Sequence, residues 1–278
     1  RGMAAVGLES RWPIMVSAGW GYQIFEPMAQ LIARPDAQDN DLIPNEDAKS
    51  LVFDDTTLFD RDKFSGYDRM EGGTRLNAGI RYRLQTNSGF SASALAGQSY
   101  HLAGENPFTT GTGLGTDRSD YVAGLYLSPI STIQIGTRVR FDEDDFELMR
   151  QDFQATGTVG PLTASAVYTD LSADPENNVL YDRKEVLGSG SLKIGDQWSL
   201  IASGRYELEG PNESQWISQG LGVSWTDESG CIGVAVAYDR QYVRDGNREP
   251  DERVTVTLTL RTITAVGLGT SLSGDQAF

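Results

Sequence analysis

A strict alternation of apolar and polar residues between Gly72 and Leu84 constrains the fold of this chain more than any other feature. Successive side chains of a β-strand point to opposite faces of a sheet, so a period of two predicts a strand. The apolar face carries Leu76, Ala78, Ile80, Tyr82 and Leu84, and the polar face carries Arg75, Asn77, Gly79, Arg81 and Arg83. We therefore expect a long strand with one apolar and one polar face.

The same alternation recurs along the chain and predicts about 13 strands, with no helical period between them. Most of these segments are about 10–14 residues long, which suits a strand that crosses a bilayer at a tilt. Strands of a soluble sandwich are usually nearer 5–6 residues. The expected strands are residues 3–12, 20–34, 72–84, 89–103, 119–128, 131–142, 146–158, 161–170, 182–195, 197–208, 214–226, 230–243 and 252–263.

The connections between these segments alternate in length along much of the chain. Short turns are expected at 85–88, 129–130, 159–160, 195–197 and 227–230, and long loops at 35–71, 104–118, 171–181 and 244–251. Aromatic residues lie near strand ends, as in interfacial girdles: Trp198, Tyr206, Trp216, Trp225, Tyr238 and Tyr242. We predict an all-β, antiparallel transmembrane β-barrel without a domain boundary; a soluble sheet protein is the alternative.

Composition limits the function classes. The chain has 278 residues, 39% of them hydrophobic, and a net charge of -16, so its surface repels nucleic-acid phosphates. No window approaches about 18 consecutive apolar residues, so no transmembrane helix is expected. The first residue is Arg1 and no signal-like segment follows it, so we interpret the chain as a piece of a longer precursor. Acidic residues in the loops suit a solvated surface, or one that faces an anionic glycolipid through divalent ions.

The expected loop before residue 72 is polar and rich in aspartate, yet it carries several large apolar side chains. Such a loop is expected to pack against its own protein instead of extending into water. The residues selected there as a loop site are Phe53, Asp54, Asp55, Phe59, Phe64, Tyr67 and Arg69.

Two other groups of residues invite a chemical interpretation. Ser99 and His101 share one strand face and suggest a Ser/His hydrolase, but no convincing third group orients the pair. The run Asp142 to Asp145 offers oxygen ligands for Ca²⁺, but it lacks the spacing and the glycine of a known calcium loop. We predict no catalytic residue, no metal and no cofactor.

Several ordered motifs resemble one known family. They are Leu42 to Asp47, Phe53 to Phe59, Phe64 to Arg69, Gly97 to Tyr100, Arg140 to Asp142, and Thr257 to Arg261. Together they resemble the C-terminal barrel region of the LPS-assembly protein LptD family, also called organic solvent tolerance protein, in an alphaproteobacterial form. The resemblance runs over most of the chain, and the ordered set is specific although no single motif is.

The resemblance implies an outer-membrane barrel that inserts lipopolysaccharide into the outer leaflet. It implies as partners lipopolysaccharide, outer-membrane lipid, the plug lipoprotein LptE in many bacteria, and a periplasmic bridge protein bound through an N-terminal jellyroll. Residues 1–278 would then be the C-terminal portion of the barrel, without the jellyroll or the first half-barrel. A self-contained diffusion pore and a β-sheet adhesin remain as alternatives.

Basic residues on the polar faces have two interpretations. They either guide the phosphates of lipid A through bidentate contacts or pair with acids of the same protein. These residues are Arg75, Arg81, Arg83, Arg138, Arg140 and Arg205.

The end of the chain carries two further expectations that come from the resemblance. Cysteines of the family near Cys231 pair with cysteines of the jellyroll, and Gly230 stands where many relatives carry a second cysteine, so one such bridge is expected. The strand expected at 252–263 would form the seam through which the lipid leaves, as the final strand of the barrel. Its gate residues would be Val254, Val256, Leu258, Leu260 and Arg261.

Overall fold

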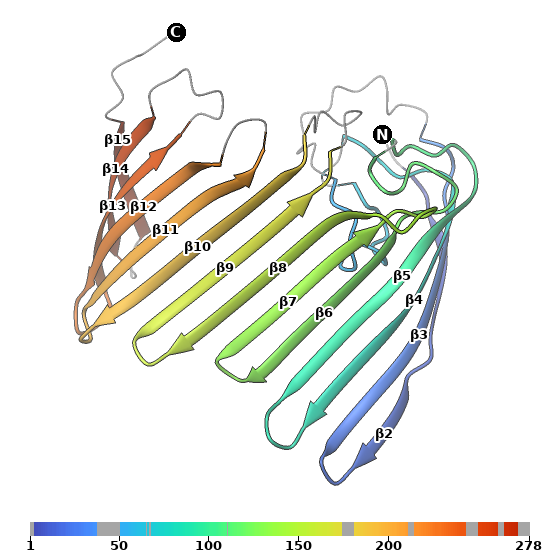
Figure 1. Cartoon of the computed structure of the whole chain (residues 1–278), viewed down its shortest axis with the longest axis horizontal. Helices are drawn as coiled ribbons and strands as arrows, with labels where there is room; N and C mark the ends of the chain where they lie inside the picture. Colours follow the sequence, from blue (N-terminus) through green and yellow to red (C-terminus); the bar gives the residue numbers. More distant parts are fainter. Residues whose placement is uncertain are drawn as a thin grey trace. The chain divides into compact units, whose positions relative to one another are not determined.

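A computed structural model describes residues 3–37, 51–64, 66, 68–109, 111–173, 181–210, 214–242 and 250–260, and the backbone of 264–271. These residues form 15 β-strands and no helix, so no helix among them could cross a membrane (Figure 1). The strands are β1 (Val6–Arg11), β2 (Ile14–Ala18), β3 (Gly21–Ala33), β4 (Thr74–Thr86), β5 (Ser91–Ala103), β6 (Tyr121–Ile130), β7 (Ile133–Phe141), β8 (Leu148–Val159), β9 (Leu162–Leu171), β10 (Arg183–Ile194), β11 (Trp198–Glu209), β12 (Gln215–Thr226), β13 (Ile232–Gln241), β14 (Asp251–Leu260) and β15 (Thr264–Ser271).

The strands pair with their neighbours in chain order, and the prediction of an all-β antiparallel sheet is confirmed. The ladder order begins at β1 and ends at β15, and β2 pairs with β3 beside β1. The contacts divide the chain into two compact units, Arg1–Phe153 with Leu171–Tyr181, and Gln154–Asp170 with Asp182–Phe278. The first unit holds β1 to β7, and the second holds β10 to β15.

The core of the first unit lies on the polar face of its sheet. There the β3–β4 connection and the β5–β6 connection fold back over the strands, at one end of β4 to β7 (Figure 1). We call residues 51–73 of the first connection the inner loop. The two connections bring apolar side chains together on this face, so the core consists of loop residues and one strand residue. Its buried members are Phe53, Leu58, Phe108, Leu114 and Val122.

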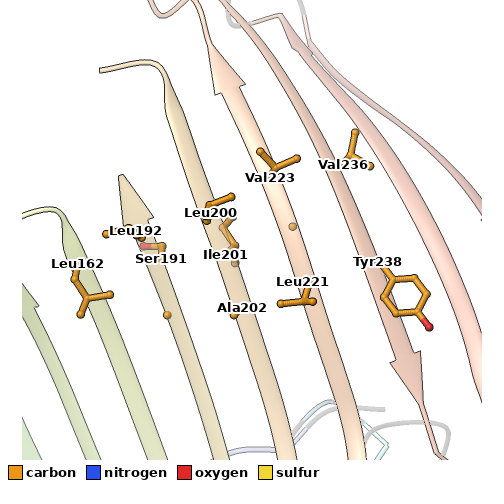
Figure 2. Close-up of a pocket in the computed structure, with 12 residues that line it drawn as sticks. Leu162, Ser191, Leu192, Leu200, Ile201, Ala202, Leu221, Val223, Val236 and Tyr238 are labelled. Atoms are coloured by element: carbon orange, nitrogen blue, oxygen red, sulfur yellow. The ribbon is translucent and has the colours of Figure 1, made fainter. Parts of the chain in front are cut away.

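The second unit has the two-faced pattern that alternation predicts. In the register of β10 to β14, Leu192, Leu200, Val223, Val236 and Val256 pair across five strands as one apolar row. Leu200 in this row is 45% exposed, so the row covers a surface and not an interior. Four members of this row line an apolar groove of about 590 Å³ (Figure 2). They are Leu192, Leu200, Val223 and Val236.

Two strands were not expected from the alternation. Pro13, Gly19 and Gly21 were expected to mark a break between the segments 3–12 and 20–34, but the ladder on β3 resumes after Pro13 as β2. The interruption falls opposite Pro27, whose carbonyl accepts a hydrogen bond from the amide of Trp12 at 3.0 Å. The glycine-rich segment 264–271 was expected to lie outside the ladder, yet it forms β15 on β14. Ladder bonds come from the backbone, so glycines at every second position do not prevent them.

Candidate functional site: the inner loop on the polar face

Two apolar side chains anchor the inner loop to the sheet. Phe53 is 1% exposed and Leu58 is fully buried against the polar face of β5. Burial of each such side chain stabilises the packed loop by about 1.5–3 kcal/mol. Phe64 extends the anchor by stacking on Phe108 of the β5–β6 connection, with ring centroids 4.6 Å apart. The loop is therefore held by a small core of its own.

Three glycines of the strands make room for this loop. Gly79 and Gly97 are paired across β4 and β5, and Gly124 lies on β6. A Cβ atom at Gly97 would stand 2.6 Å from the side chain of Leu58, which is closer than real Cβ atoms approach. A Cβ at Gly124 would stand 2.2 Å from the carboxylate of Asp55. The loop sits where the strands lack side chains.

Two adjacent aspartates join the loop to strands far along the chain. The carboxylate of Asp54 accepts the amide of Thr56 at 2.8 Å and pairs with Arg138 of β7 at 3.1 Å. The carboxylate of Asp55 accepts the hydroxyl of Tyr126 of β6 at 3.0 Å. Burial raises the pKa of Asp55 above its ordinary value, although the Tyr126 hydrogen bond opposes that shift. Both contacts orient the loop as well as attach it.

A buried ion cluster closes the other end of the loop. The carboxylate of Glu71 lies 2.8 Å from Arg75, 3.6 Å from Arg34 and 3.9 Å from Lys63. All four side chains are at most 6% exposed. Burial lowers the pKa of Lys63 to about 8, against the opposing field of Glu71. Removing Glu71 would leave three buried cations without their shared carboxylate, which is strongly destabilising.

The other polar-face arginines named from the sequence also contact acids. Arg83 lies 3.1 Å and Arg81 4.0 Å from Glu26 of β3. Arg140 lies 3.3 Å from Asp120, whose pKa is raised to about 6 by burial in spite of this arginine. Of the six, Arg205 alone has no acid within 4 Å among the described residues.

Sequence reasoning missed the residues at the centre of this arrangement. Glu26, Lys63, Glu71 and Asp120 were not selected, because charged residues normally face water. The only signal was their position beside apolar residues, as with Lys63 before Phe64. Tyr67 and Arg261 lie outside the described residues.

The remaining sequence candidates occupy ordinary structural positions. Ser99 is fully buried and its hydroxyl donates to Asn77 at 2.6 Å, whereas His101 Nε2 contacts the carbonyl of Gly104 at 3.0 Å. The structure does not join Ser99 and His101 as a nucleophile and its base. Asp142 accepts the amide of Asp144 at 2.8 Å, which closes the β7–β8 turn. Among the described residues, no three His, Cys, Asp or Glu side chains gather in a way that could hold a metal ion.

The candidate seam residues lie in a strand that is paired on both sides. Val254, Val256, Leu258 and Leu260 belong to β14, which pairs with β13 and also with β15. The expectation that this strand is the last of the ladder is therefore wrong, because the backbone continues the ladder by one strand. Cys231 is exposed in the β12–β13 turn and its thiol is free.

Comparison with known proteins gives this architecture a family. The model of the LptD family, described as LPS transport system D, matches residues 1–198. LPS-assembly protein LptD of Azoarcus sp. (strain BH72) is 25% identical over 254 residues, which cover 88% of this chain and 29% of that protein. LPS-assembly protein LptD of Sodalis glossinidius (strain morsitans) is 25% identical over an alignment 278 residues long. This alignment covers 89% of this chain and 34% of that protein.

The chain thus spans about a third of the length of these relatives. A solved structure of a Rh. blastica porin mutant aligns with 97% of the chain and 94% of its own, at 8% identity and a TM-score of 0.40. The resemblance of the ordered motifs is confirmed by the family match over residues 1–198: the chain belongs to the LptD family.

Proposed function

We propose that this chain is part of an outer-membrane translocon that inserts lipopolysaccharide into the outer leaflet of the Gram-negative outer membrane. The observation that carries the proposal is a sheet with one apolar and one polar face whose polar face is covered by a packed loop, in a chain of the LptD family. The curated relatives are both named LPS-assembly proteins.

The apolar and polar faces suit the lipid bilayer and the aqueous interior that an outer-membrane barrel separates. The apolar row that ends at Val256 suits contact with lipid tails, and the neighbouring Thr255 and Thr257 suit a wet interior. The ion-paired inner loop covers part of the polar face of the first unit, which argues against a self-contained diffusion pore. Lipopolysaccharide, outer-membrane lipid, a plug lipoprotein of the LptE kind and a periplasmic bridge protein are the partners of this proposal.

The seam for lateral exit belongs, in this proposal, at the end of the ladder. Since β15 follows β14 in the ladder, we propose that the seam opens at β15, Thr264–Ser271. The gate residues named from the sequence then lie on the neighbouring strand, β14. An edge strand presents unpaired backbone N–H and C=O groups, so the bonds that it would form on closing a barrel can part while its pairing with β14 stays intact. A lipid with a polar head and apolar chains needs such an opening to pass from the interior to the bilayer.

Depletion of the natural full-length protein in its own cells tests the function. If the proposal is right, depletion reduces lipopolysaccharide at the cell surface, and a plasmid copy restores it. A diffusion pore would instead reduce solute uptake while surface lipopolysaccharide stays normal. An adhesin would change neither, so normal surface lipopolysaccharide after verified depletion would reject the proposal.

A pair of photo-crosslinkers at neighbouring positions tests the assignment of the two faces. A crosslinker at Val256 of the full-length protein should form adducts with membrane phospholipid. The matched crosslinker at Thr257 should form adducts with lipopolysaccharide and few with phospholipid. Equal phospholipid labelling at both positions would show that the two faces are not separated as proposed.

A further inference from the structure

A cavity of about 310 Å³ lies on the polar face of the first unit, between β1, β3 and the inner loop. Its walls include Glu9, Gln30, Arg34 and Arg61. Sites for small molecules start at about 300 Å³, so the cavity suits a group of the size of a sugar ring. Two cations and one anion in so small a volume indicate a ligand that carries charge.

The cavity shares Arg34 with the buried ion cluster. In that cluster three cations, Arg34, Lys63 and Arg75, surround the single carboxylate of Glu71. The four side chains therefore hold two positive charges in excess while they are almost completely shielded from water. Asp60 and Asp62 are exposed on the inner loop. The negative charge of Asp60 acts on Lys63 and opposes the lowering of its pKa, and the carboxylate of Asp62 accepts a hydrogen bond from the amide of Glu71 at 3.4 Å. A buried excess of this kind is relieved by an anion that brings two negative charges.

The donors at the cavity wall are suited to phosphate. Guanidinium groups present several N–H donors in a fixed fork that matches the oxygens of a phosphate group. Arg34 is held in place, with a side chain only 6% exposed. Arg61 is exposed and has no acid within 4 Å among the residues that the structure describes.

The opposite wall carries acceptors. The carboxylate of Glu9 lies 3.4 Å from the amide nitrogen of Gln30, and that same nitrogen donates to the carbonyl of Phe59 at 3.1 Å. One oxygen of Glu9 is paired with Arg11, and its carboxylate would repel a second phosphate while its other oxygen accepts hydrogen bonds from hydroxyl or amino groups. A ligand that satisfies both walls therefore has a phosphate at one end and hydroxyl or amino donors at the other.

We propose that this cavity binds a phosphate monoester carried on a sugar, with Arg34 and Arg61 on the phosphate and Glu9 on the sugar. The ligand is either the headgroup of a glycolipid or a free sugar phosphate. The glycolipid source rests on the proposed function, whereas the site itself rests on the cavity and the cluster.

Titration calorimetry of the full-length protein in detergent micelles tests the site, with glucose 6-phosphate as the probe. Wild-type protein should bind it saturably, and Arg61→Gln should weaken binding at least tenfold. Arg61 is exposed, so the substitution leaves the packed core intact. Arg118→Gln removes an exposed arginine outside the cavity and should change the affinity less than twofold.

A second variant separates the fork geometry from charge alone. Arg34→Lys keeps the positive charge but loses the planar donors, and should weaken glucose 6-phosphate binding about threefold to tenfold. Absence of saturable binding, or equal losses in the Arg61 and Arg118 variants, would overturn the proposal.

Competition experiments distinguish the two sources. Lipopolysaccharide that displaces glucose 6-phosphate, and loses this ability after enzymatic dephosphorylation, assigns the site to a glycolipid headgroup. Displacement by inorganic phosphate but not by lipopolysaccharide assigns it to a free sugar phosphate. Normal surface lipopolysaccharide after depletion, together with intact glucose 6-phosphate binding, would reject the proposed function and keep the site.

Discussion

Three glycines shape the site, because the absence of a side chain at each leaves room for the inner loop. Gly79, Gly97 and Gly124 form the surface on which Phe59, Leu58 and Asp55 rest. In the sequence they are ordinary small residues at polar positions of alternating strands. Only the register between β4, β5 and β6 brings them under one loop, and that register depends on contacts far apart in the chain.

Substitution of one of these glycines should detach the loop locally. In Gly124→Ala the new methyl group would overlap the Asp55 carboxylate, and we expect a loss of about 1–3 kcal/mol in the free energy of unfolding. Urea unfolding of the full-length protein in micelles measures this change. Gly188→Ala is the control, since no atom lies within 4 Å of its added Cβ. Equal losses in both variants would contradict the packing described for the inner loop.

Asp120 should give the protein a distinct pH dependence. Burial raises the pKa of this carboxyl group from 3.8 to about 6, so between these values the folded state keeps a proton that the unfolded state releases. The free energy of unfolding therefore falls as the pH rises from about 4 to 6. Asp120→Asn should flatten this part of the unfolding profile, and Asp144→Asn, at an exposed carboxylate, should not. An unchanged slope in the Asp120 variant would show that its carboxyl group titrates normally.

At the scale of elements, the inner loop acts as one packed unit. Leu58 is its most buried side chain, and Leu58→Ala should cost about 2–4 kcal/mol because a cavity remains on the strand face. If the loop covers the wet interior, this variant should also make cells more sensitive to large antibiotics that the outer membrane normally excludes.

The control for this variant is Leu125→Ala. Leu125 lies on β6 of the same unit and is 41% exposed, so its loss removes a comparable side chain without opening a cavity. Growth inhibition assays and urea unfolding measure the two effects separately. Equal antibiotic sensitivity in both variants would show that the loop does not limit permeation.

Elements were predictable from the sequence where a local pattern decides them. The alternation around Leu76 to Leu84 predicts β4 because one side of the strand is apolar throughout. β15 was not predictable in this way, because Gly267 and Gly269 carry no side chains that could mark a face. The partners of Glu71 were not predictable either, since they come from separate segments and meet only after the loop folds.

At the scale of the whole molecule, Cys231 offers a test of attachment to a part of the protein beyond this chain. It is exposed in a short turn, and from the resemblance to LptD we expect its partner to lie in a jellyroll domain. We expect a disulfide at Cys231 in the natural full-length protein and a free thiol in the 278-residue chain. Peptide mapping by mass spectrometry without reduction distinguishes these states. An unmodified Cys231 in the natural protein would contradict the tether.

The contact between Asp54 and Arg138 sets an order of events during assembly. The two residues are 84 positions apart, and the loop that carries the first is synthesised long before the strand that carries the second. Until β7 pairs with β6, the loop lacks its most distant anchor and is held only by its contacts with the earlier strands. Closing a stretch of this length costs conformational entropy, so we expect the contact between Asp54 and Arg138 to form only after β7 has paired with β6.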